Sequence, residues 1–327
     1  MDNIYIHEVG PRDGLQVEKT TVPLEEKIRW IEGLFNSGID IIQLGSFVHP
    51  ERVPQMADTD ALFRYFSEKG NKPENVILSG LVLNERGLER GLACGVEMFC
   101  MGVSASETHS KKNTGMTPKE AQARILSMAK EAQVAGRKVQ ASVQSAFGCG
   151  FEGPIAKEKV LDIVKAYLDA GIRNISLADT AGHAQPEQVE DLYGTIRQLD
   201  SEVEMACHFH NTYGLGLANC YIALKSGVTY FESAFGGLGG CPFTKLPAGN
   251  VSTEDLVHSL QRMGLRKDIK LDALLDDLTV RGWLSDERAA ARLVHLGRPG
   301  PRRRHGVGRR LRGRRRLDHQ PGRADAA

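Results

Sequence analysis

The feature of this sequence that most constrains its fold is an eightfold alternation of short apolar runs with longer amphipathic segments. Apolar runs bounded by turn residues predict buried strands, and segments with apolar residues every three or four positions predict helices. The predicted strands cover residues 4–9, 39–44, 76–82, 96–102, 138–144, 173–178, 203–208 and 228–234, and the predicted helices cover residues 24–37, 57–69, 85–93, 117–136, 155–170, 186–199, 215–226 and 253–263. Eight such units in series predict a parallel sheet, and their number favours a closed (β/α)8 TIM barrel over an open sheet.

Length and composition agree with one such barrel, which we assign to residues 1–287. A (β/α)8 domain takes about 250 residues. No apolar run approaches the roughly 20 residues of a membrane span, so we expect no membrane partner. The six cysteines include no CxxC pair, and the first predicted strand leaves no room for a leader peptide. We therefore expect reduced thiols in a cytoplasmic protein.

Residues 288–327 differ in composition from the rest of the chain. They contain 13 Arg and 2 Asp but no Lys, Glu, Ser, Thr or aromatic residue, so their net charge of +11 leaves −10 on residues 1–287 within the whole-chain charge of +1. An Arg block can bind nucleic acid, but this one has no Lys, no aromatic residue for stacking and no periodicity. Its amino-acid composition resembles the translation of GC-rich DNA in the wrong reading frame. We interpret it as a disordered or out-of-frame tail and expect no nucleic-acid partner.

Two histidines, His208 and His210, lie at the end of the predicted strand 203–208. Residues i and i+2 of a strand point to the same face, so both imidazoles project together at a spacing that suits two ligands of one divalent metal. A glycine-rich turn and a predicted helix follow, which places the pair where barrel enzymes hold their active sites. The alternative is a pair of hydrogen-bonded or surface histidines, which is the commoner use of an isolated H-x-H.

The first predicted strand runs into a Gly/Pro-rich loop that carries an adjacent cation and anion, Arg12 and Asp13. Asp13 could supply a third, anionic metal ligand, and Arg12 could hold an oxyanion. The alternative for neighbouring Arg and Asp residues in a turn is a surface ion pair of little energetic value.

The last predicted strand runs into a segment with four glycines around one thiol, from Gly236 through Cys241, which continues to Asn250. Such a segment predicts a mobile lid that carries a reactive cysteine over the site. The alternative is a flexible connection with a buried cysteine.

Together these three segments resemble the hydroxymethylglutaryl-CoA lyase family of metal-dependent TIM-barrel lyases. The matching motifs are VGPRDGLQ from Val9 to Gln16, the H-x-H followed by Thr212-Tyr213-Gly214, and GLGGCP from Gly237 to Pro242 with Gly249-Asn250 after it. The resemblance extends from Ile4 to Leu275. The VGPRDGLQ motif also separates the chain from the related isopropylmalate-synthase-like enzymes, whose loop usually reads TLRDG.

The resemblance implies cleavage of 3-hydroxy-3-methylglutaryl-CoA to acetyl-CoA and acetoacetate, as in leucine degradation and ketone body metabolism. It implies a divalent cation, Mg²⁺ or Mn²⁺, in the environment of Asp13, His208, His210 and Asn250. It also implies Arg12 at the enolate oxygen, Cys241 as a proton donor or acceptor, and Asp179 as either a base or an orienting carboxylate. An acyl-CoA is the expected small-molecule partner, and a homodimer or higher homo-oligomer is the expected assembly.

One position departs from the family pattern. The second strand of the family normally ends in I-E-T-T-S-F, whereas this chain reads Ile42-Gln43-Leu44-Gly45-Ser46-Phe47. Gln43 keeps the shape of the family Glu but has no charge and no base function, and the changes at Leu44 and Gly45 are expected to reshape the same wall. A lyase for another 3-hydroxyacyl-CoA, such as citramalyl-CoA, is therefore an alternative, as is an inactive barrel retained for binding.

Recognition of CoA is predicted in the loop after the fourth strand, where Lys111, Lys112 and Asn113 lie together. Lysine is a common partner of phosphate groups. The equally weighted alternative is that both lysines are simply solvated, as most surface lysines are.

Removal of the Arg-rich tail provides the first test. A chain that ends at Glu287 should keep the cooperative thermal unfolding and the metal affinity of the full-length protein, because the tail has few apolar side chains to bury and its positive charges repel each other. Thermal melts and Mn²⁺ titrations of the two proteins would check this. Loss of both properties would show that the tail packs on the barrel.

Overall fold

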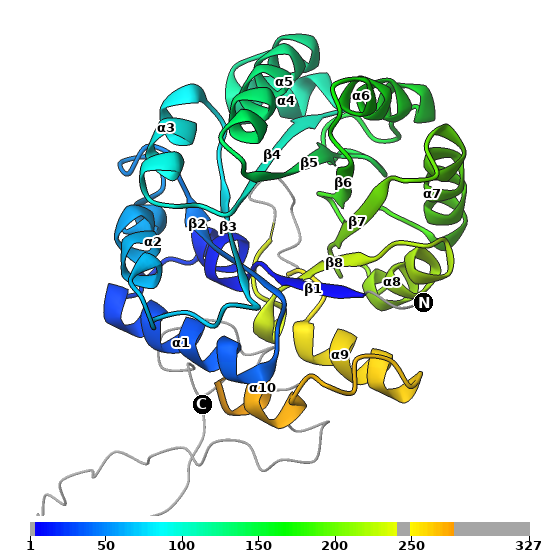
Figure 1. Ribbon diagram of the computed structural model, residues 1–327. Coiled ribbons are helices and arrows are strands. Elements are labelled where there is room, and N and C mark those ends of the chain that lie inside the picture. Colours follow the sequence, from blue (N-terminus) through cyan, green and yellow to red (C-terminus); the bar gives the residue numbers. More distant parts are fainter. Residues whose placement is uncertain (1–3, 241–248, 278–327) are drawn as a thin grey trace, which may run out of the picture.

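A computed structural model gives the structure of residues 4–240 and 249–277. Eight parallel strands close into a barrel in sequence order, with β1 paired to both β2 and β8 (Figure 1). The strands are β1 (Tyr5–Glu8), β2 (Ile41–Ser46), β3 (Ile77–Leu81), β4 (Met98–Ser104), β5 (Lys138–Gln144), β6 (Asn174–Asp179), β7 (Glu204–Phe209) and β8 (Tyr230–Ser233). All eight predicted strands are present, and the predicted TIM barrel is confirmed.

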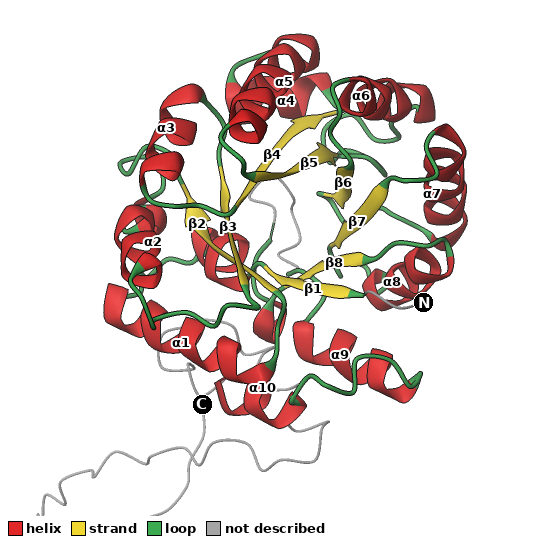
Figure 2. Cartoon of the chain, viewed as in Figure 1, coloured by secondary structure: helices red, strands yellow, loops and turns green. Residues whose placement is uncertain are grey.

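Helices surround the barrel on its outside (Figure 2). They are α1 (Leu24–Ser37), α2 (Thr59–Ser67), α3 (Glu85–Ala93), α4 (Glu107–Thr114), α5 (Pro118–Val134), α6 (Lys157–Asp169), α7 (Pro186–Leu199), α8 (Gly216–Lys225), α9 (Thr253–Arg262) and α10 (Leu271–Asp277). The eight predicted helices are confirmed within about two residues at each end. The sequence prediction missed α4 and α10, of which α10 packs against α1.

Helix α4 escaped prediction because its residues, ETHSKKNT, carry no apolar periodicity. Local groups define its ends instead. The Ser106 side chain accepts a hydrogen bond from the backbone N–H of His109, and Gly115 ends the helix in the left-handed conformation with φ of 77°. Lys111 and Lys112 thus lie in the last turn of a helix, and the prediction that they belong to a loop was wrong.

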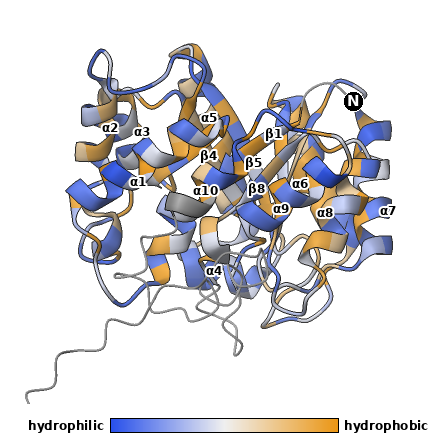
Figure 3. Cartoon of the chain, turned by 90° about the horizontal axis from the view of Figure 1, so that it is seen from below, coloured by the Kyte–Doolittle hydropathy of each residue, from blue (hydrophilic) through white to orange (hydrophobic). Residues whose placement is uncertain are grey.

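The interior of the barrel is polar, although TIM barrels usually fill this space with bulky branched side chains. Hydrogen bonds cross it between strands that are not neighbours. His7 Nε2 lies 2.7 Å from Ser79 Oγ, and Ser176 Oγ donates to Glu232 Oε1 at 2.8 Å. The large apolar side chains pack between the strands and the helices, whose hydrophilic residues face outward (Figure 3). Small polar residues therefore leave a space inside the barrel below the carboxyl ends of the strands.

The buried carboxyl group of Glu8 joins the end of β1 to the segment that follows β8. One of its oxygens accepts the backbone N–H groups of Gly10 at 2.7 Å and Phe235 at 3.0 Å, and the other accepts the Thr253 hydroxyl at 2.5 Å. Burial raises the pKa of Glu8 to about 8. This carboxyl group thus positions two loops that border the active-site end of the barrel.

Two observations on the described residues concern the cysteines and the hydropathy of the helices. Five of the six cysteines, at positions 94, 100, 149, 207 and 220, are buried free thiols. In the described helices, no segment has the length and hydropathy that crossing a bilayer requires. Cys241 and the Arg-rich residues 288–327 lie outside the described residues, so the expectations for them remain predictions.

Replacement of Glu8 should reveal its structural role. Glu8→Leu leaves two backbone N–H groups without an acceptor, so it should lower the free energy of unfolding by at least about 2 kcal/mol. Glu8→Gln is the matched control, because a carboxyl group with a pKa near 8 is mostly protonated at pH 7 and resembles an amide. Urea denaturation at pH 7 would measure both. Equal losses in the two variants would mean that these hydrogen bonds contribute little.

Candidate metal centre and active-site cavity

The two histidines of the H-x-H motif lie together at the carboxyl end of β7. His208 is in the strand and His210 follows it, and their Nε2 atoms are 3.1 Å apart. Both residues are buried, with exposed fractions of 7% and 6%. The prediction that both imidazoles project to one side is confirmed.

Asp13 approaches this pair from the other end of the sequence. It lies in a single helical turn, Gly10–Gly14, directly after β1. One ligand atom from each of Asp13, His208 and His210 lies within 4.8 Å of the others, and all three residues are buried. Carboxylate and imidazole ligands suit a divalent ion such as Mg²⁺ or Mn²⁺ better than thiolates would. The cluster therefore has the composition and spacing of a site for one divalent cation.

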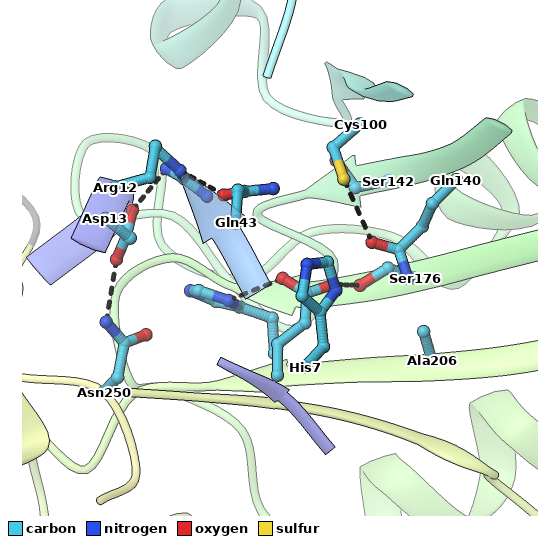
Figure 4. Close-up of polar contacts among 12 residues, drawn as sticks. His7, Arg12, Asp13, Gln43, Cys100, Gln140, Ser142, Ser176, Ala206 and Asn250 are labelled. Atoms are coloured by element: carbon cyan, nitrogen blue, oxygen red, sulfur yellow. Dashed lines mark hydrogen bonds and ion pairs between the residues drawn. The ribbon is translucent and has the colours of Figure 1, made fainter. Parts of the chain in front are cut away.

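Asn250 supports the carboxylate of this cluster (Figure 4). Its Nδ2 donates to Asp13 Oδ2 at 2.8 Å and to the Leu238 carbonyl at 2.9 Å. Its Oδ1 is buried and has no hydrogen-bond partner among the described residues. A buried amide oxygen without a partner is costly, so Asn250 has an atom available for a ligand beside Asp13.

Arg12 forms a buried contact with Asp13 and is not part of a surface ion pair. Its Nη1 donates to Asp13 Oδ1 at 2.6 Å, and its Nε donates to Gln43 Oε1 on β2 (Figure 4). Arg12 is 9% exposed. The two contacts hold the plane of the guanidinium group at the wall of the site, as charge-assisted hydrogen bonds do.

The protonation states of two of the three cluster residues, Asp13 and His210, favour cation binding at neutral pH. Burial alone would raise the pKa of Asp13, but the nearby Arg12 and the two histidines hold it at about 2. Burial, with the neighbouring His208, lowers the pKa of His210 to about 4. Metal ligands must be deprotonated, so Asp13 and His210 are already in the required form at pH 7.

Glu232 on β8 completes the site, and the sequence analysis missed it. Its Oε2 lies 3.0 Å from His208 Nδ1, and its Oε1 accepts the Ser176 hydroxyl. Burial lowers the pKa of His208, but the contact with Glu232 outweighs burial and raises it. A carboxylate on the far nitrogen of a metal-binding histidine fixes its tautomer and orientation. Glu232 could have been recognised in the sequence as an acidic residue within an otherwise apolar predicted strand.

An open cavity of about 900 Å³ connects this cluster with the interior of the barrel. Among the predicted site residues, those that line it are Arg12, Asp13, Gln43, Asn113, His208 and His210. Cationic Lys19 and Arg52, which the sequence analysis did not identify, line the same cavity.

Comparison with known proteins agrees with this geometry. A family profile described as HMGL-like matches residues 3–279. The hydroxymethylglutaryl-CoA lyase of Bacillus subtilis is 37% identical over 92% of this chain and 95% of its own length. The (R)-citramalyl-CoA lyase of Chloroflexus aurantiacus is 34% identical over 92% of this chain and 96% of its own length. The chain belongs to the HMGL-like family. Like its relatives, it is a carbon–carbon lyase.

Solved structures of hydroxymethylglutaryl-CoA lyases have a similar fold, and one of them contains bound ligands. The HMG-CoA lyase of Acinetobacter baumannii, in complex with coenzyme A and 3-methylmalate, aligns with a TM-score of 0.78 and 34% identity over 96% of this chain and 98% of that chain. The Bacillus subtilis HMG-CoA lyase aligns with a TM-score of 0.80 and 35% identity over 93% of this chain and 97% of that chain.

Some predicted site residues of this HMGL-like protein do not line the cavity. Lys111 and Lys112 are absent from its lining, and the Lys112 ammonium lies 4.1 Å from the centroid of the Phe151 ring. Lys19 and Arg52 are the cationic side chains that do reach the cavity from loops. The sequence could not reveal that Lys19 and Arg52 reach one cavity, because Lys19 follows β1 and Arg52 follows β2, and only the folded barrel brings these loops together.

Asp179 lies at the end of β6, but its carboxylate is not part of the cavity lining. Its Oδ1 accepts the backbone N–H of His183 at 2.7 Å. Burial raises the pKa of Asp179 to about 7. Of the two predicted roles, base and orienting group, this placement agrees with a carboxylate that orders the turn between β6 and α7.

The three departures from the family pattern on β2 have different consequences. Gln43 lines the cavity, whereas Leu44 and Gly45 do not. A Cβ atom on Gly45 would come within 2.3 Å of Thr59 Oγ1 on α2, outside the barrel. The expectation that Leu44 and Gly45 reshape the same wall as Gln43 was therefore wrong. Leu44 faces the other side because successive strand residues alternate, and the register shift between Gln43 and Gly45 breaks the alternation that would otherwise place Gly45 beside Gln43.

Metal titration tests the cluster of this family member. Mn²⁺ added to metal-free protein should bind one site, and His208→Ala should abolish or greatly weaken that binding. Glu232→Gln should weaken it by about 10–100-fold, the usual effect of losing such a supporting carboxylate. Isothermal titration calorimetry would measure all three affinities.

The matched control for this titration is His183→Ala, since His183 lies at the same end of the barrel, stacked on Tyr213, but outside the cluster. His183→Ala should bind Mn²⁺ as the parent does. Unchanged affinity in His208→Ala would contradict the assignment of the cluster as a metal site.

Proposed function

We propose that this protein is a metal-dependent lyase that cleaves 3-hydroxy-3-methylglutaryl-CoA, or a close 3-hydroxyacyl-CoA relative, to acetyl-CoA and a keto acid. The observation that carries the proposal is the buried cluster of Asp13, His208 and His210 beside Arg12, in a cavity wide enough for an acyl chain. Hydroxymethylglutaryl-CoA lyases are among the relatives with similar length and fold.

The donor set fits the expected cation, Mg²⁺ or Mn²⁺. Asp13 supplies anionic oxygen and the two histidines supply neutral nitrogen, and the unpartnered Oδ1 of Asn250 offers a further oxygen. A divalent cation held there would lower the pKa of the tertiary hydroxyl group of the substrate and so favour its deprotonation.

Arg12 is proposed to stabilise the product enolate. When a base takes the hydroxyl proton, the O–H electrons form the ketone at C3, the electrons of the C2–C3 bond move into the thioester, and negative charge develops on the thioester oxygen. A guanidinium group fixed in place by Asp13 and Gln43 can donate to that oxygen without reorganising during the reaction. This is the role that the family motif implies for Arg12.

A proton must then reach C2 of the enolate to give acetyl-CoA. Cys241 is our proposed donor on the basis of the family motif, and its position falls outside the described residues. Gln43 cannot exchange a proton in this step because an amide does not titrate. The contact of Gln43 with Arg12 instead supports a role in positioning the guanidinium group.

Recognition of the CoA moiety is proposed to involve the cavity entrance. Lys19, Arg52 and Asn113 line the cavity and offer donors to phosphate or pantetheine groups. The complex of the Acinetobacter baumannii relative with coenzyme A supports an acyl-CoA substrate for this fold. Lys111 and Lys112 precede Asn113 but do not line the cavity, and the Lys112 ammonium lies against the Phe151 ring, so Lys19 and Arg52 are the better-supported phosphate partners in this proposal.

A citramalyl-CoA-type substrate is the second candidate. Gln43 removes a negative charge from the cavity wall, and one relative of similar length is named (R)-citramalyl-CoA lyase. The third alternative, an inactive barrel retained for binding, is disfavoured because Arg12 is held beside the candidate metal ligands in the same cavity, where it can meet a developing oxyanion.

The test is a parallel assay of the parent protein and Gln43→Glu on hydroxymethylglutaryl-CoA and citramalyl-CoA, with and without Mn²⁺. We expect metal-dependent cleavage by the parent. We expect Gln43→Glu to raise cleavage of hydroxymethylglutaryl-CoA, since one positioned acid–base group is worth about 10²–10⁴ in rate. Separation of the CoA products by liquid chromatography would measure both rates. The Mn²⁺ affinity of Gln43→Glu should equal that of the parent.

Gln144→Glu is the matched control, because Gln144 also lines the cavity but makes no contact with Arg12 among the described hydrogen bonds. A fall in the activity of Gln43→Glu on both thioesters, with the parent favouring citramalyl-CoA, would identify the second candidate substrate. Absence of cleavage of either thioester by metal-loaded parent protein would refute the proposed lyase function.

A further inference from the structure

We propose that Gln55 is a positioning residue that holds Lys19 and Arg52 together as a clamp for the phosphate groups of the acyl-CoA. This inference rests on the proposed lyase function and deepens its account of substrate recognition. Gln55 lies in the short helical turn Pro54–Met56 after β2 and does not itself line the cavity. It therefore acts through Lys19 and Arg52, which we call the cation pair.

The two members of the cation pair belong to neighbouring loops. Lys19 lies in the loop after β1 and Arg52 in the loop after β2, and both side chains are exposed and line the cavity. The helices that follow these loops, α1 and α2, lie side by side (Figure 1). Glu18 lines the same cavity and offsets one of the two positive charges. Because like charges on adjacent loops repel each other, a contact that joins the loops favours their joint placement.

Gln55 makes such a contact. Its Nε2 donates a hydrogen bond to the backbone carbonyl of Glu18 at 2.6 Å. Glu18 directly precedes Lys19, and Gln55 follows Arg52 by three residues. This hydrogen bond therefore joins the two loops within a few residues of each cation.

A buried lysine on α1 fixes the position of Gln55. Lys27 is 1% exposed, and its Nζ donates to the backbone carbonyl of Gln55 and to Asp58 Oδ1, both at 2.6 Å. Burial of an ammonium group is costly unless its donors are satisfied, and both of these acceptors lie in the segment between β2 and α2. Lys27 thus ties the loop that carries Arg52 to the helix that follows the loop of Lys19.

The start of the loop after β2 is held separately. Arg90 on α3 donates to the backbone carbonyls of Phe47 at 3.4 Å and Val48 at 3.3 Å. Arg52 lies between this anchor and Gln55, so its loop is tied at both ends. Of the two anchors, Gln55 is the one that also reaches the loop of Lys19.

A fixed cation pair should bind phosphate groups more tightly than two cations on independent loops, because less conformational freedom is lost on binding. The phosphates of CoA belong to its nucleotide end, whereas the proposed chemistry takes place at the acyl end, beside the metal cluster. Loss of the Gln55 contact should therefore weaken binding of the nucleotide end and leave the chemical step unchanged. This difference separates a positioning role from a general structural role.

The first experiment measures binding of S-methyl-CoA, a thioether that cannot be cleaved, to Mn²⁺-loaded protein by calorimetry. Gln55→Met keeps the length of the side chain but cannot donate, so its Kd should be about tenfold higher than that of the parent, the effect of roughly one hydrogen bond. Gln188→Met is the matched control. Gln188 on α7 also donates to a loop carbonyl, that of Phe147 at 3.2 Å, but this loop carries neither cation. The control should bind as the parent does, and thermal melts would show that both variants are folded.

The second experiment compares thioesters of CoA and of pantetheine, which lacks the phosphates, with the same acyl group. Gln55→Met should raise KM for the CoA thioester about tenfold with kcat unchanged, and its kcat/KM for the pantetheine thioester should equal that of the parent. In a protein that already carries Lys19→Ala and Arg52→Ala, Gln55→Met should have no further effect on the CoA thioester, because the side chains that it positions are gone.

Several outcomes would overturn the clamp: equal Kd values for the parent and Gln55→Met, an equal loss in Gln188→Met, an equal loss on the pantetheine thioester, or a further loss in the protein without the cation pair. The lyase function is tested independently. Cleavage of the pantetheine thioester by a parent protein that does not bind S-methyl-CoA would refute the clamp and keep the lyase. A tenfold effect of Gln55→Met on binding, without cleavage of any thioester, would support the clamp and refute the lyase.

Discussion

The buried contact between Arg12 and Asp13 is the interaction on which the rest of the site depends. It places a cation and an anion together, nearly out of water, at the end of β1, which is costly unless each charge has further partners. Gln43 supplies a partner for Arg12 from β2, and Asn250 supplies one for Asp13 from the segment after β8. The closed barrel brings both neighbours to β1, so the ion pair is satisfied only in the folded protein.

The polar interior of the barrel is the second constraint. Hydrogen bonds such as those between His7 and Ser79, and between Ser176 and Glu232, replace part of the apolar packing that usually fills a TIM barrel. Small polar side chains occupy less volume, and the cavity extends inward from the metal cluster as a result. The stability of the domain accordingly depends on apolar packing between the strands and the helices.

Much of this architecture was predictable because its signals are local. Each strand and eight of the ten described helices follow from apolar periodicity, which acts within a few residues. The H-x-H spacing alone predicted that His208 and His210 share a face. Their position at the end of a predicted strand indicated that they lie at the carboxyl end of the barrel. Helix α4 was missed because its polar sequence lacks that periodicity and its ends depend on Ser106 and Gly115.

By itself, the sequence determined the barrel, the order of its strands and the end at which chemistry takes place, because strand period and βα alternation are properties of neighbouring residues. Only the tertiary structure decided which distant side chains meet. It placed Glu232 behind His208 and kept Lys111, Lys112 and Asp179 out of the cavity lining. Contacts of this kind join strands far apart in sequence, so they depend on the register of the strands in the closed barrel, which no local pattern encodes.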